Sequence, residues 1–271
     1  MRPSRHRIDI FSVSAIDLFA SALGAFLVVS FVLLPYFPNP GEAPPATAAP
    51  PAAAPGLPPT PPGAAPQAPR LTSIDLIIAL DTTTSMGREV ARLREEIAGL
   101  ATLLARLVDD AAVGLIDFKD RCDPVTAVRV APLASINPAS AERLAAFARS
   151  MRVGGSPCDR TLEEDYAEAL QAAVAADWRP GAEQRSIVMI SDSPAHADLR
   201  ARAIADARRF SRRTGSVHTV SAVFVDTGRS ADRADTMTFM AQVASAGGGR
   251  FVRTDRDASL SVLILGAIIN D

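Results

Sequence analysis

An acid and two hydroxyl side chains follow one apolar segment of the chain at alternate positions. Residues 74–80 are almost entirely apolar, and Asp81, Thr83 and Ser85 come directly after them. Alternate residues of an extended turn point the same way, so one carboxylate and two hydroxyls can converge on one cation. Ligation by oxygen alone suits Mg²⁺, or Mn²⁺ or Ca²⁺, better than Zn²⁺. The spacing therefore predicts a site for a hard divalent cation.

Two later segments also carry oxygen ligands. Asp192 ends the apolar segment 187–191, and Thr161 lies in a loop before a predicted helix. Helix capping is the alternative for Asp81 and Ser85, because such side chains can bond free backbone amides at a helix start. Capping alone does not explain an acid at the end of a second strand. We therefore predict a five-residue metal site, consisting of Asp81, Thr83, Ser85, Thr161 and Asp192.

Strands and helices alternate from residue 71 onward, and these elements must position the site. We expect strands at 74–80, 112–118, 125–130, 186–191, 217–225 and 250–253, and helices at 87–108, 137–149, 162–175, 197–213, 233–246 and 258–269. Few residues separate the second strand from the third, so these two should form an antiparallel hairpin. The pattern predicts a doubly wound α/β fold, with a mostly parallel six-stranded sheet, one antiparallel edge strand and helices on both faces.

Apolar residues recur at steps of three and four along the first of these helices. They form a single stripe that should face the sheet, and they are Val90, Leu93, Ile97, Leu100, Leu104 and Leu107.

The metal motif and the element order resemble the von Willebrand factor type A domain over residues 71–271. The family motif Asp-x-Ser/Thr-x-Ser is present at 81–85. Bacterial members are similar at 154–155 (Gly-Gly), 177–181 (Asp-Trp-Arg-Pro-Gly) and 192–196 (Asp-Ser-Pro-Ala-His). The second loop departs from the family pattern because it is longer, so Asp159 competes with Thr161 as its ligand.

The resemblance implies a metal-ion-dependent adhesion site that binds rather than catalyses. In the family an open position on the metal accepts a carboxylate from a protein ligand. A metal-dependent hydrolase is the less favoured alternative, because no nucleophile or general base is evident. His196 follows a proline turn, where a lone histidine is more often a loop or capping residue than a catalyst.

The N-terminal part of the chain has the pattern of a membrane anchor. Arginines at positions 2, 5 and 7 precede an uncharged run at 18–37, about 20 residues long, which is enough to cross a bilayer. The positive-inside rule then predicts a cytoplasmic tail at 1–9, a transmembrane helix at 10–37 and a periplasmic remainder, in a bacterial inner membrane. A cleaved signal peptide is the alternative, but its apolar core is usually shorter.

Residues 38–70 are almost wholly Pro, Ala and Gly and lack apolar periodicity, so we expect a disordered linker. The formal net charge of −2 and the pI near 6.0 give no reason to expect a nucleic-acid partner. We interpret the local cluster of arginines at positions 208, 209, 212 and 213 as a solvent-exposed face of a helix.

Three further residues carry interpretations that depend on an extracytoplasmic domain. Cys122 and Cys158 would form a disulfide in an oxidising periplasm, although two free thiols are the alternative.

Asp17 heads the predicted membrane helix, where an acid is costly. This stretch looks similar to the single-span anchors of flagellar stators and energy-transducing systems, which would make the protein an accessory channel subunit with Asp17 as proton relay. A capping box with Ser14 is the structural alternative.

Overall fold

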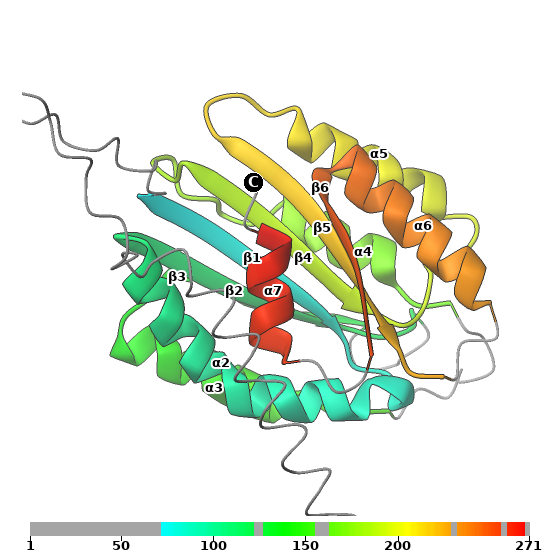
Figure 1. Cartoon of the computed structure of the whole chain (residues 1–271), viewed down its shortest axis with the longest axis horizontal. Coiled ribbons are helices and arrows are strands. Elements are labelled where there is room, and N and C mark those ends of the chain that lie inside the picture. Colours follow the sequence, from blue (N-terminus) through cyan, green and yellow to red (C-terminus); the bar gives the residue numbers. More distant parts are fainter. Residues whose placement is uncertain (1–71, 122–126, 155–162, 229–231, 256–258, 269–271) are drawn as a thin grey trace, which may run out of the picture. The chain divides into compact units, whose positions relative to one another are not determined.

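Continuous apolar segments form the central strands of one six-stranded sheet. The computed structural model describes residues 72–121, 127–154, 163–228, 232–255 and 259–268. The strands are β1 (Ser73–Asp81), β2 (Asp110–Phe118), β3 (Val128–Ser135), β4 (Gln184–Ser191), β5 (Val217–Asp226) and β6 (Gly248–Asp255). Their order is β3-β2-β1-β4-β5-β6, and every pairing is parallel except that of β2 with β3. The predicted sheet, with its antiparallel edge strand, is confirmed (Figure 1).

Three helices cover each face of this sheet (Figure 1). One face carries α2 (Gly87–Leu107), α3 (Pro138–Ser150) and α7 (Leu260–Ile268), and the other carries α4 (Tyr166–Val174), α5 (Arg200–Ser211) and α6 (Arg233–Ala246). An apolar cluster fills the space between the sheet and the helices on each face. Successive side chains of a strand point to opposite faces, so Leu76 packs in the cluster under α2, α3 and α7, and Ile77 in the cluster under α4, α5 and α6. Burial on both faces explains why the central strands β1 and β4 are apolar over most of their length rather than at alternate positions.

The apolar stripe of α2 is confirmed except at its last member. Val90, Leu93, Ile97, Leu100 and Leu104 are buried, whereas Leu107 is 55% exposed. Leu107 is the last residue of the helix, and Val108 after it is already extended. No helical turn follows to cover the Leu107 side chain. Periodicity alone therefore predicted wrongly that Leu107 is buried.

The edge strand β3 begins and ends later than the predicted range 125–130. It runs from Val128 to Ser135 and includes Pro132, which cannot donate to a ladder and is tolerated only at a sheet edge or a bulge. The register of β2 against β3 shifts between Val113 and Leu115. A Cβ atom on Gly114 would lie 3.2 Å from the Ala131 carbonyl oxygen, so the glycine allows the two backbones to approach at this bulge.

Two helices begin later than expected. Glu164 and Ala195 form an isolated parallel bridge, which holds the segment before α4 extended, so α4 begins at Tyr166 rather than 162. Residues 197–199 form a turn, in which the Leu199 amide donates to the His196 carbonyl at 2.8 Å, so α5 begins at Arg200 rather than 197. Asn137 caps α3 with a capping box, so the predicted start of that helix is confirmed.

Several sequence predictions lie outside the described residues. These are the membrane helix at 10–37, the linker at 38–70, Asp17, Asp159, Thr161 and the pair Cys122 and Cys158. In the parts of the chain that are described, none of the helices combines the length and apolarity needed to cross a membrane.

Candidate functional site

The two predicted acids meet at the carboxyl edge of the sheet. Asp81 is the last residue of β1, and Asp192 follows directly after the neighbouring parallel strand β4. Hydroxyl groups link them in a chain. Thr83 Oγ1 donates to Asp81 Oδ1 at 2.6 Å and lies 3.3 Å from Ser85 Oγ, which donates to Asp192 Oδ1 at 3.0 Å. The structure thus brings together four of the five predicted residues.

The turn after β1 sets the direction of these side chains. Asp81 Oδ1 also accepts the Thr83 amide at 2.8 Å, so the carboxylate holds the turn from inside. Thr83 remains extended before a short 3₁₀ helix, η2 (Thr84–Met86), which leads into α2. Neither η2 nor α2 has a side-chain cap at its start. Helix capping therefore does not account for Asp81 and Ser85, although Asp81 does satisfy one backbone amide.

Two hydroxyls that sequence reasoning missed hold the outer oxygens of the acids. Ser191 Oγ donates to Asp81 Oδ2 at 2.7 Å, and Thr227 Oγ1 donates to Asp192 Oδ2 at 2.5 Å. Thr227 follows β5, which lies beside β4 and ends at the same edge. Thr227 could have been found from the sequence, because a polar residue directly after a parallel strand lies at the end of the sheet where ligands bind.

Burial gives this cluster its electrostatic character. Asp81 is fully buried and Asp192 is 3% exposed. Loss of water around Asp81 raises its pKa to about 7, and the negative charge of Asp192 adds to the rise. Two acids so close together and removed from water repel each other, and a cation between them would relieve that repulsion.

The donor set fits a hard cation. Carboxylate and hydroxyl oxygens are ligands for Mg²⁺, Mn²⁺ or Ca²⁺. Among the described residues no group of three or more His, Cys, Asp or Glu side chains is placed to hold a metal. A cation at this edge would therefore depend on Thr83 and Ser85 as well as on the two acids.

His196 lies in the loop after β4 and contacts carboxylates. Its Nε2 is 2.8 Å from Asp120 Oδ1, and its Nδ1 is 3.7 Å from Glu163 Oε2. His196 and Asp120 are both buried. Within the described residues, His196 has no hydrogen bond to a serine, threonine or cysteine. Its contacts instead hold the loops after β2 and β4 together.

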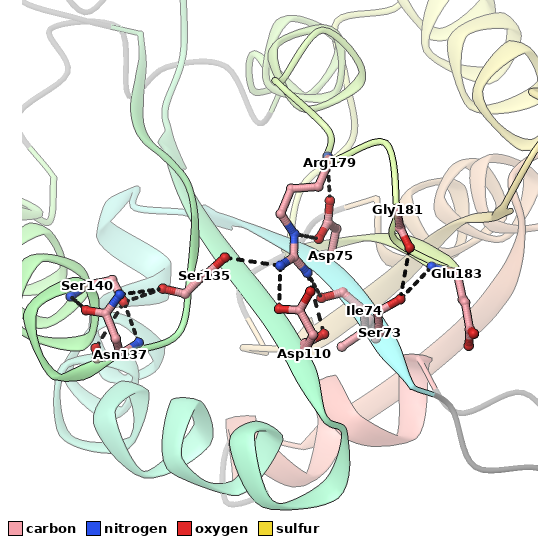
Figure 2. A network of polar contacts seen from close by, with 10 residues as sticks. All are labelled: Ser73, Ile74, Asp75, Asp110, Ser135, Asn137, Ser140, Arg179, Gly181 and Glu183. Atoms are coloured by element: carbon pink, nitrogen blue, oxygen red, sulfur yellow. Dashed lines mark hydrogen bonds and ion pairs between the residues drawn. The ribbon is translucent and has the colours of Figure 1, made fainter.

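The Trp-Arg-Pro-Gly segment at 178–181 precedes β4. Its arginine lies beside Asp75 and Asp110 at the starts of β1 and β2, whereas Asp81 is at the other end of β1 (Figure 2). Arg179 Nε donates to Asp75 Oδ1 at 2.6 Å, and the Arg179 amide donates to Asp75 Oδ2 at 2.8 Å. The same guanidinium donates to Asp110 at 2.5 Å and to Ser135 Oγ at 3.1 Å. Arg179 thus joins the starts of β1 and β2 to the end of β3, so this segment has a structural role.

Solved structures of other proteins share the fold of this domain at low sequence identity. The pilus adhesin SpaC from Lactobacillus rhamnosus GG is 12% identical with a TM-score of 0.52, and the match covers 74% of this chain and 30% of the adhesin. The chain thus spans less than a third of the adhesin's length. Together with the sheet order and the antiparallel edge strand, this similarity supports the fold that the sequence resemblance implies. The described residues thus form an α/β domain whose fold resembles that of the von Willebrand factor type A domain.

Two further structures match more weakly. The conserved hypothetical protein BatB from Bacteroides thetaiotaomicron is 19% identical, with a TM-score of 0.47 over 71% of this chain and 95% of BatB. Proximal thread matrix protein 1 from the mussel byssus is 16% identical, with a TM-score of 0.49 over 73% of this chain and 47% of that protein. No protein-family model and no curated protein matches the sequence.

Proposed function

We propose that the type A-like domain binds a protein ligand through a divalent cation held at the carboxyl edge of its sheet. The observation that carries this proposal is the hydroxyl-linked pair of buried acids, Asp81 and Asp192. Asp81, Thr83, Ser85 and Asp192 would hold the cation, with Thr161 or Asp159 as the further ligand. The bound cation would supply positive charge that attracts a carboxylate of the partner.

Two features support binding over catalysis. The hydroxyl ligands are neutral, so a cation keeps much of its charge and can attract an acid from outside. The buried histidine nearest the site is engaged with carboxylates rather than with a nucleophile among the described residues. In the same proposal, residues 10–37 anchor the chain in a bacterial inner membrane, and residues 38–70 tether the domain in the periplasm.

Calorimetric titration of the purified chain with Mg²⁺ tests the metal site. We expect Asp81→Asn to weaken Mg²⁺ binding at least about tenfold, because it removes a charged ligand while keeping the shape of the side chain. Asp198→Asn is the matched control, since it removes a 64% exposed carboxyl group from the loop after β4. Equal affinities in wild type and Asp81→Asn would contradict the site.

A pull-down from membrane extract tests the partner. Proteins that bind the wild-type chain in Mg²⁺, and are lost both in chelator and with Asp81→Ala, are the expected ligands. Identical sets of captured proteins under these conditions would show that binding does not pass through the cation.

A further inference from the structure

A groove between α5 and α6 lies apart from the candidate metal site. Its volume is about 900 Å³, which is within the range of ligand-binding clefts. The groove is lined by Ile204, Arg208 and Arg212 on α5 and its end, and by Thr238, Ala241, Gln242, Ser245 and Ala246 on α6. Figure 1 shows these two helices side by side on one face of the sheet.

Polar links close both ends of the groove. Arg200 pairs with Asp235 at 2.6 Å where the two helices begin, and Ser211 Oγ donates to the Ala246 carbonyl at 3.0 Å where they end. The helices therefore run side by side in the same direction. Because each follows a parallel strand and returns along the sheet, the Arg212 end lies toward the edge opposite Asp81.

The charge of the groove is positive and uncompensated. Arg208 and Arg212 are one helical turn apart and exposed. In the described part of the chain neither forms an ion pair, whereas Arg202 pairs with Glu168, Arg209 pairs with Asp206, and Arg213 lies over the Phe210 ring. The lining holds no acidic side chain.

The remaining lining suits a peptide. Thr238, Gln242 and Ser245 offer hydrogen-bonding groups on the wall opposite the arginines, and partly buried Ile204 and Ala241 provide apolar surface between the walls. Small apolar residues between two polar walls leave room for a backbone to approach. Two guanidinium groups one turn apart match two carboxylates with the spacing of side chains four apart on a helix.

We propose that this groove binds an acidic segment of a partner protein, with one carboxylate of the partner on Arg208 and a second on Arg212. This contact is independent of the cation proposed at Asp81, so together with that site it would let one domain engage two ligands at separate surfaces.

Fluorescence anisotropy with a synthetic peptide tests the groove. The probe is a labelled alanine-based peptide with two glutamates four residues apart, and its control carries glutamines instead. We expect the full-length chain to bind the glutamate peptide more tightly, in chelator as well as in Mg²⁺ and equally in Asp81→Asn. The double variant Arg208→Gln/Arg212→Gln should weaken binding about tenfold, the combined effect of two exposed ion pairs.

Two matched variants make the result specific. Arg106→Gln/Arg143→Gln removes two exposed charges from α2 and α3 and should leave binding unchanged. Ala241→Trp fills the groove while keeping both arginines and should abolish binding. Equal weakening by both arginine pairs, or full binding by Ala241→Trp, would overturn the proposal. Binding to phosphatidylglycerol vesicles that depends on Arg208 and Arg212, without binding to the peptide, would overturn it in favour of a membrane surface.

Discussion

Each acid of the candidate site is held by hydroxyls on two sides. Asp192 accepts from Ser85 on its Oδ1 and from Thr227 on its Oδ2. A carboxylate fixed at both oxygens has a defined direction before any cation arrives, and such partners of metal ligands strongly affect affinity. Thr227 is therefore a positioning residue for Asp192 rather than a proposed ligand.

Thr227→Val should weaken Mg²⁺ binding about tenfold, because valine keeps the shape of threonine but cannot orient Asp192. Calorimetric titration measures the affinity. Thr102→Val is the control, since the Thr102 hydroxyl is exposed and donates to the Ala98 carbonyl within α2. An unchanged affinity in Thr227→Val would show that the hydrogen bond to Asp192 does not position a ligand.

At the scale of elements, the edge of the sheet opposite the site is secured by one arginine. Asp75 is fully buried inside β1, and it receives both the side chain and the backbone amide of Arg179. A buried charge that loses its partner is costly, because water cannot replace the lost interaction. The Arg179 contacts therefore fix the starts of β1 and β2, whose opposite ends lead to the site.

Arg179→Gln should lower the free energy of unfolding by about 3 kcal/mol, because the Asp75 carboxylate is left buried without the positively charged guanidinium that pairs with it. Urea denaturation measures this loss. Arg149→Gln breaks an ion pair that is exposed on both sides and should change stability by less than about 1 kcal/mol. Adding Asp75→Asn to Arg179→Gln should recover part of the loss. If Arg179→Gln is as mild as Arg149→Gln, the buried pair does not stabilise the sheet.

The sequence predicted the identity and order of these elements better than their ends. Apolar runs were sufficient for β1 and β4, and helical periodicity was sufficient for α2. They failed where tertiary contacts decide, as at Pro132 in the β3 bulge and at the bridge between Glu164 and Ala195. The acids of the site were readable because each ends a strand. Thr227 also follows a strand, but a single threonine there belongs to no recognised motif, so it was missed. The partners of Arg179 were missed because they lie far from it in the chain.

At the scale of the whole domain, the two apolar clusters share the same strands. Leu76 and Ile78 belong to one cluster, while Ile77 and Ala79 belong to the other. Neither face can lose its helices without disturbing strands on which the other face packs. We therefore expect the clusters to unfold together, although each has its own three helices.

The single tryptophan reports on this coupling. Trp178 packs on Phe210 in the cluster with α5, with ring centroids 5.1 Å apart. Leu100→Ala removes a buried side chain from α2 on the other face and should cost about 2 to 5 kcal/mol. Trp178 fluorescence and far-ultraviolet circular dichroism should then show the same lowered urea midpoint.

Leu107→Ala is the matched control on the same helix. Its side chain is 55% exposed, so its loss should change stability by no more than about 0.5 kcal/mol. Separate midpoints for the two probes in Leu100→Ala would mean that the faces unfold independently. In that case a ligand in the α5–α6 groove could not stabilise the strands beneath α2. If the midpoints coincide, a ligand at the proposed groove and a cation at the proposed metal site would stabilise one and the same folded unit.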